Sequence, residues 1–216
     1  MKNKENKQMI LVIVILLIIL GIIGIYENHY NTNTYNAIEY GDNLKNAVNN
    51  FTKSQNKFND KIKKVVNNTN DELKKGDVDI IKVANDWESE WKDIMDKYES
   101  LQKDFKDVGN KSLEYFKELD KLANNIKNED IKKSEIKKNL ILKEKWTKNY
   151  ENTSKVFDEI NELLKDGNDF HNVLIASSIR QKINLNIEEL KNIAFRAQDI
   201  LERLNKFTEE GKKLIS

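Results

Sequence analysis

Two tryptophans and a tyrosine are the side chains best suited to binding chemistry in this sequence. Trp87 and Trp91 are four residues apart, and Tyr98 lies one turn beyond Ile94, so in a helix these rings share one face. An aromatic face of this kind can bind a peptide or a glycan. The same positions also fit the buried stripe of a packed helix, and packing is the better interpretation.

Polar residues in unusual places supply the other candidate contacts. The densest basic cluster consists of Lys132, Lys133, Lys137 and Lys138. Such a cluster can contact an acidic partner or an envelope polymer, although most basic runs are solvated bends. Gln55 and Arg180 lie on or near apolar stripes, where a polar side chain often fixes helix register or reaches a partner. Together with the two tryptophans, these residues are our candidates for interaction.

Residue types that catalyse reactions are present, but not in catalytic arrangements. His29 and His171 are far apart, and neither has a glutamate three residues before it, as the Glu-x-x-His pairs of di-iron bundles require. The absence of cysteine excludes thiolate nucleophiles, cysteine-ligated metals and a lipoprotein. No HExxH, P-loop or glycine-rich dinucleotide motif occurs. We therefore expect a protein that is not an enzyme and binds no cofactor or metal.

Charge and composition restrict the fold class and the partners. The 37 lysines and arginines are interspersed with 36 acids, so no overall field attracts nucleic acid. Charged residues make up 34% of the chain and proline is absent, which favours long helices with solvated outer faces over a turn-rich β fold. The expected class is all-α.

An apolar run near the start predicts a membrane anchor. Residues 9–26 read MILVIVILLIILGIIGIY, without a charge, and as a helix they span about 27 Å, near the hydrocarbon thickness of a bilayer. Lys2, Lys4 and Lys7 precede this run, whereas residues 27–35 contain no lysine or arginine. The positive-inside rule then places the N-terminus in the cytoplasm and the remainder outside.

A cleaved signal peptide is the competing interpretation of this segment. Signal peptides have a shorter apolar core of about 7 to 15 residues and end in small residues. The segment here ends in Ile25, Tyr26 and Glu27, which make a poor cleavage site. We therefore predict an uncleaved signal anchor in the cell membrane, with a single pass.

Apolar residues spaced by three and four positions predict helices through the rest of the chain. The expected helical stretches are 34–68, 79–108, 112–126, 136–164 and 169–204. Turn-forming residues separate them at 67–71, at Gly109 and at Gly167, with Ser112 and Asp169 as caps of the following helices. Whether the third and fourth stretches form one kinked helix is left open.

The pattern of helical stretches predicts a single transmembrane helix followed by an elongated antiparallel bundle of four to five long helices. The expected division is 1–8 cytoplasmic, 9–26 anchor, 27–33 linker, 34–208 bundle and 209–216 frayed tail. Short connections make consecutive helices neighbours, and a regular seam of this kind also allows a homo-oligomer.

The leading functional hypothesis is a membrane-anchored, extracytoplasmic protein without enzymatic activity that binds another protein or a component of the cell envelope. The alternative is a small-ligand sensor with a pocket between helices, contacted by Trp87, Trp91 and Arg180. A lytic factor that rearranges onto a bilayer is a third possibility, and the balanced charge disfavours it.

Overall fold

The computed structural model describes the backbone of residues 2–75, 77–180 and 184–215, and the side chains in those ranges from residue 38 onward except 184 and 185. Its helices are α1 (Lys2–Leu73), α2 (Ile80–Asn124), α3 (Glu129–Arg180) and α4 (Asn184–Leu214). This described part contains no strand. The predicted all-α class is confirmed. The described part of the chain forms four helices, where four to five were expected in the bundle.

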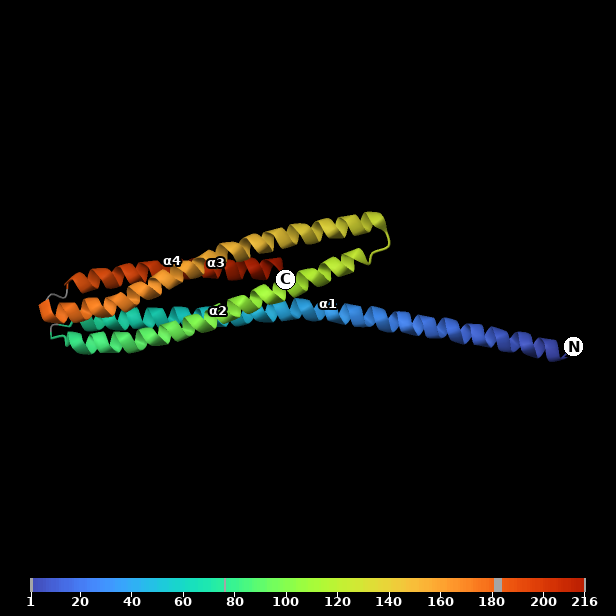
Figure 1. Ribbon diagram of the computed structural model, residues 1–216, viewed down its shortest axis with the longest axis horizontal. Helices are drawn as coiled ribbons and strands as arrows, with labels where there is room; N and C mark the ends of the chain where they lie inside the picture. The colour runs from blue at the N-terminus through green and yellow to red at the C-terminus, as the bar shows by residue number, and fades with distance from the viewer. Residues whose placement is uncertain (1, 76, 181–183, 216) are drawn as a thin grey trace.

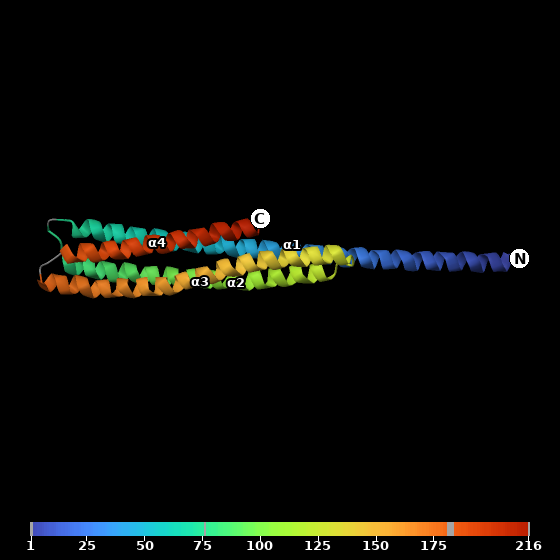
Figure 2. The ribbon, with the colours of Figure 1, turned by 90° about the horizontal axis from the view of Figure 1, so that it is seen from above.

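The helices form an elongated antiparallel bundle in which each is packed between its two neighbours. α1 packs against α2 and α4, and α3 also packs against α2 and α4. Figures 1 and 2 show the helices running in alternating directions, with the end of α1 and the start of α2 at the same end of the bundle as the end of α3 and the start of α4. At the other end α1 projects beyond the rest, because its 72 residues span about 110 Å.

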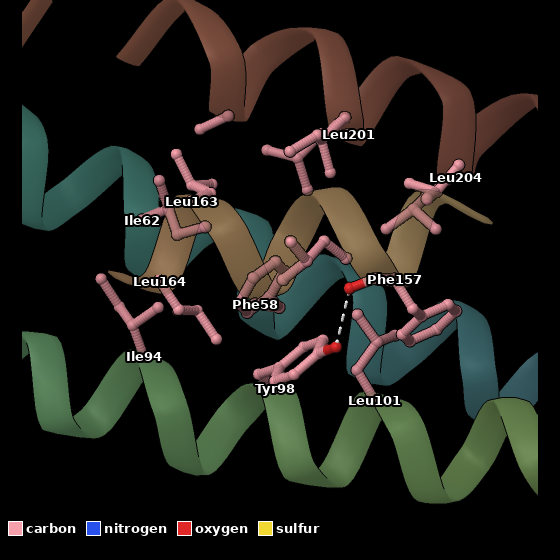
Figure 3. Packing of buried hydrophobic residues seen from close by; sticks show 14 of the residues in the cluster. Phe58, Ile62, Ile94, Tyr98, Leu101, Phe157, Leu163, Leu164, Leu201 and Leu204 are labelled. Carbon is pink, nitrogen blue, oxygen red and sulfur yellow. Dashed lines mark hydrogen bonds between the residues drawn. The ribbon is translucent and has the colours of Figure 1, made fainter. Parts of the chain in front are cut away.

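A continuous apolar core runs between the helices, and the predicted seam residues form it. Leu44, Val48, Phe51, Phe58, Ile62 and Val65 of α1 are all at most 2% exposed. Figure 3 shows Phe58 and Ile62 of α1 beside Ile94 and Leu101 of α2, with side chains of α3 and α4 closing the core. Spacings of three and four residues place one face of each helix toward this common centre.

Tyr98 is the predicted polar member of the aromatic face, and its hydroxyl is used inside the core. The hydroxyl donates a hydrogen bond of 3.0 Å to the carbonyl oxygen of Phe157 (Figure 3). Burial raises the pKa of Tyr98 to about 12, so the phenol stays protonated and keeps this bond at neutral pH.

Two predicted helix ends are wrong, because α2 continues through Gly109 and α3 through Gly167. These glycines make room for aromatic rings of a neighbouring helix. A Cβ atom at Gly167 would lie 1.8 Å from Cζ2 of Trp91, and one at Gly109 would lie 2.5 Å from the hydroxyl oxygen of Tyr150. Ring packing therefore offsets the cost of about 1 kcal/mol that a glycine brings to a helix interior.

The two predicted caps beside those glycines are wrong for the same reason. Ser112 is buried inside α2, where its hydroxyl donates to the carbonyl oxygen of Gly109 at 2.7 Å. Asp169 lies in the interior of α3. A capping side chain bonds to the free amides of a first helical turn. Because α2 and α3 continue through these positions, no helix begins there for Ser112 or Asp169 to cap.

The observed helix ends lie at other positions. α1 ends at Leu73, a few residues after the predicted turn, and Asp79 caps α2 by accepting a 3.0 Å hydrogen bond from the Lys82 amide. The predicted third stretch is the last part of α2. It is separate from α3, whose first turn is capped by Asn128 through hydrogen bonds of 3.1 Å to two backbone amides.

Both ends of the chain contain more helix than expected. Residues 27–33, the predicted linker, are helical and continue α1, and the predicted frayed tail is helical through Leu214. The linker contains no proline or glycine, and extending an existing helix is much easier than starting a new one. These residues therefore follow the helix on either side.

The predicted anchor, residues 9–26, lies on α1 but outside the part of the chain whose side chains are described. Within the part of the chain whose side chains are described, no helix is long and apolar enough to cross a membrane.

Candidate interaction sites

Trp87 and Trp91 lie inside the core. Each indole is 1% exposed, the two rings are stacked at 4.7 Å, and Phe170 of α3 packs edge-on against Trp87. Their ring nitrogens donate to α3 carbonyl oxygens, Trp87 to Gly167 at 2.7 Å and Trp91 to Leu164 at 3.1 Å. These rings join α2 to α3, so they offer no face to an incoming peptide or glycan.

Gln55 forms a buried polar layer between α1 and α4. Its side chain is 2% exposed, and its amide nitrogen donates to Oδ1 of Asn205. The hydroxyl of Thr208, also buried, donates to Oε1 of Gln55 at 2.8 Å. Both polar ends of Gln55 are therefore bonded, and a shift of α4 along α1 would leave them without partners. This geometry favours a role in helix register.

Arg180 is the last residue of α3 and is exposed. Its Nε donates to the carbonyl oxygen of Ala176 one turn earlier, at 3.2 Å. Residues 181–183, which follow it, lie outside the described residues. Because the two tryptophans are enclosed in the core, the structure does not bring Arg180 and their rings together as walls of one open pocket.

The four lysines lie at the hairpin tip, which we define as residues 121–145: the end of α2, the connection to α3 and the start of α3. The tip contains eight lysines and four acids. Lys138 pairs with Glu135 at 2.6 Å on the same helix. Lys132, Lys133 and Lys137 have no ion pair with any described acid. The candidate cluster is therefore a largely uncompensated basic surface.

Exposed apolar side chains accompany these lysines. Ile131, Ile136, Leu140 and Ile141 are between 39% and 54% exposed. Figure 1 shows the tip at the end from which α1 projects, beyond the last residue of α4. Ile136 and Leu140 belong to the expected helical stretch 136–164, but Leu140 is six residues before the buried Trp146, a spacing that puts the two on different faces of α3.

The opposite end of the bundle is acidic, a feature that the sequence analysis missed. Residues 68–90 contain seven acids and three lysines. A hollow of about 730 Å³ lies there between α1 and α2, lined by polar side chains that include Thr69, Glu72, Lys75, Lys82, Asp86 and Glu90. Overall neutrality conceals this charge separation, which a count over each end of the rod would have revealed.

A metal centre is not formed by the side chains that the structure describes, where no three histidines, aspartates or glutamates are grouped as ligands. His171 is half-buried, and its Nδ1 lies 3.0 Å from the carbonyl oxygen of Ala84. Its contact is with the backbone of α2, which fits a packing role.

Comparisons with known proteins give no family or function. No protein family model matches the chain, and the searches of curated proteins and of solved structures found no significant match.

Proposed function

We propose that this chain is a non-enzymatic protein anchored in the cell membrane by residues 9–26, with a rod-like helical bundle on the extracytoplasmic side that binds another protein or an envelope component. The observation that carries the proposal is the continuity of α1. The uncharged segment 9–26 and the first helix of the bundle belong to one helix, Lys2–Leu73.

This continuity supports a fixed attachment. A helix rises about 1.5 Å per residue, so the span from Tyr26 to Leu73 extends the bundle about 70 Å from the end of the anchor. The hairpin tip lies at the anchor end of the rod, and the acidic end lies farthest from it (Figure 1). The proposed protein therefore presents an acidic surface at a distance from the membrane.

The distribution of side chains supports binding over catalysis. The aromatic pair that could have formed a recognition face is enclosed, and the remaining candidates are charged surfaces at the two ends of the rod. An acidic end attracts a basic partner and speeds its encounter with the rod, an effect that salt weakens.

Membrane fractionation tests the anchor. The full chain should pellet with membranes and resist extraction by high salt, and protease added to intact cells should digest the bundle. Leu16→Arg with Leu17→Arg should release the protein, because each arginine at a helix centre costs about 2.5 to 3.5 kcal/mol on insertion. Leu16→Ala with Leu17→Ala is the matched control and should remain in the membrane.

Crosslinking of the intact protein followed by purification tests the binding role and should recover one main partner. Turnover by the purified full chain that is abolished by a single Glu→Gln or Asp→Asn substitution would contradict the non-enzymatic assignment. A bundle protected from protease in intact cells would contradict the extracytoplasmic side.

A small-ligand sensor is the second candidate, and the hollow at the acidic end favours it. Its lining contains four acids and two lysines. Glu72 pairs with Lys75 and Glu90 with Lys61, whereas Asp86 has no ion pair with a described residue, which suits a cationic ligand. A thermal-denaturation screen against small cations should then find a ligand that raises the melting temperature, an increase that Asp86→Asn with Glu72→Gln reduces. No concentration-dependent rise with any compound would eliminate this candidate.

A further inference from the structure

We propose that the hairpin tip is a second membrane contact, in which its lysines bind the anionic headgroups of the same bilayer that holds residues 9–26. This inference rests on the proposed anchor. It assigns the basic cluster a partner of defined chemistry: the phosphate groups of anionic lipids.

Pairing between α1 and α2 sets the height of the tip above the membrane. The backbone of Gly41 lies beside the ring of Tyr115, and Ser54 of α1 donates to the carboxylate of Asp104 of α2. Gly41 and Tyr115 are therefore level with each other. Because the two helices are antiparallel, ten residues forward along α2, from Tyr115 to Asn125, correspond to ten residues back along α1, from Gly41 to about residue 31. Tyr26, the end of the anchor, is about 8 Å farther along the helix.

Pairing between α2 and α3 places the first lysines at the same height. The side chain of Asn139 donates to the carbonyl oxygen of Leu119 at 3.0 Å, so these two residues are nearly level. Counting back along α3 puts Lys132 and Lys133 close to the level of Asn125. The headgroup layer extends about 5 to 8 Å beyond the hydrocarbon on each side. Both lysines therefore lie within about one Debye length of the lipid phosphates at physiological salt.

The chemistry of the tip fits this position. Lys133 and Lys137 are exposed and Lys132 is half-buried, and none of the three has an acidic partner among the described residues, so their charges are available to lipid. Each lysine near an anionic surface adds to the attraction, and the (CH₂)₄ stems can lie along apolar surface. Ile131, 54% exposed, is at the same height and can pack shallowly against the headgroup region.

The apolar residues of the tip argue against a simple solvated bend. Counted back from the buried Trp146, the inward-facing positions of α3 hold Leu142, Asn139, Glu135 and Lys132, so polar residues occupy much of the seam. Ile136 and Leu140 face outward instead. Because the outward side of α3 at the tip carries apolar residues and its inward side carries polar ones, this segment is suited to bind a partner outside the bundle. With the proposed anchor on α1, the bilayer is the surface nearest to the tip.

A headgroup-quenching measurement on the full chain tests the contact. The chain contains no cysteine, so Ser134→Cys can be labelled uniquely with a fluorophore and the protein reconstituted in vesicles whose lipids carry a nitroxide on the headgroup. In vesicles containing phosphatidylglycerol the label should be strongly quenched, and in pure phosphatidylcholine only weakly. A label at Ser89→Cys, about 60 Å along the rod, should remain unquenched in both.

Charge reversal with a matched control separates the lysine contact from mere proximity. Lys132→Glu with Lys133→Glu should lower the ratio of bound to unbound tip by roughly fivefold or more for each lysine. Lys63→Glu with Lys64→Glu changes two adjacent, exposed, unpaired lysines of α1 far from the bilayer and should leave the quenching unchanged.

The outcomes distinguish the tip contact from the anchor. Protein that fails to float with the vesicles contradicts the anchor, and the tip contact is lost with it. Protein that floats but shows no quenching at residue 134, or equal quenching in both lipids, contradicts only the tip contact. Quenching in phosphatidylglycerol vesicles that survives Lys132→Glu with Lys133→Glu also overturns it.

Discussion

The bundle body, where all four helices overlap, and the hairpin tip use the same helix α3 in opposite ways. In the body, Phe157, Ile160 and Leu164 follow spacings of three and four residues and are at most 7% exposed. At the tip, Leu140 is 53% exposed while Asn139 and Glu135 face inward. The difference teaches that apolar residues mark a core only where their spacing keeps them on the side where another helix lies.

Truncating one leucine in each region should give the largest difference between them. Leu164→Ala should lower the free energy of unfolding by about 2 to 5 kcal/mol, because it leaves a cavity in the apolar core. Leu140→Ala removes the same atoms from an exposed position, so it should change the free energy of unfolding by less than about 0.5 kcal/mol. Denaturant titration of the full chain in detergent measures both, and equal effects would remove the distinction between body and tip.

Adding one methyl group tests the close packing of the body. Gly167→Ala places its Cβ against the ring of Trp91 and should destabilise the fold by about 1 to 3 kcal/mol or more. Gly211→Ala meets Trp146 at 3.6 Å, an ordinary contact, and should stabilise α4 by up to about 1 kcal/mol. Opposite shifts in melting temperature are expected. A stabilising Gly167→Ala would show that the Trp91 ring is free to move.

The polar layer of Gln55 should contribute a smaller amount. Gln55→Ala removes the side-chain partner of Asn205 and leaves the Thr208 hydroxyl with only the carbonyl oxygen of Leu204, and it should cost about 1 to 3 kcal/mol. Adding Thr208→Val to Gln55→Ala should recover part of that loss, which a double-mutant cycle measures. Strictly additive effects would mean that the layer does not couple α1 to α4.

The ion pair between Arg203 and Glu159 should give the smallest effect, with a defined pH dependence. Hydrogen bonds from Arg203 hold the pKa of the Glu159 carboxyl below its ordinary value of 4.5. A lowered folded-state pKa stabilises the fold above about pH 4.5, and the contribution is lost as the pH falls through the folded value. Because the side chain of Glu159 is 47% exposed and that of Arg203 is 38% exposed, solvent screening limits the contribution of the ion pair to stability to about 1 kcal/mol.

Denaturant titrations of Glu159→Gln at pH 7 and pH 3 measure this contribution. The variant should be less stable than the parent at pH 7 and nearly equal to it at pH 3. Glu135→Gln at the tip removes a pair within one helix, so it should have almost no effect at either pH. A larger difference at pH 3 than at pH 7 would contradict the assigned sign.

Most of the body could be predicted from the sequence because its pattern and its packing agree. The expected stretches 34–68 and 79–108 lie within α1 and α2, and apolar residues spaced by three and four positions in them, from Leu44 to Val65 in α1, are buried. Gly109 and Gly167 misled the analysis, because a glycine that ends a helix and one that admits a ring from a neighbouring helix look alike in one dimension. Only the partner helix distinguishes them.

The candidate contacts were predicted less well, for a related reason. Trp87 and Trp91 are candidates by residue type, but their burial depends on α3, about eighty residues away in the chain. The lysine cluster was found because it is local in sequence. The acidic end was missed because its seven acids are spread over residues 68–90 among three lysines, so no dense acidic run marks it, and the total charge of the chain is nearly neutral.

The unbroken course of α1 also has a torsional consequence. Each residue of a helix turns it by about 100°, so one residue inserted in 27–37 would rotate the whole rod by that angle relative to the proposed anchor. Seven inserted residues would return it to within about 20° of its original azimuth. If residues 9–26 are held in a bilayer as proposed, the direction in which the rod faces its neighbours is set by the number of residues between segment 9–26 and the bundle.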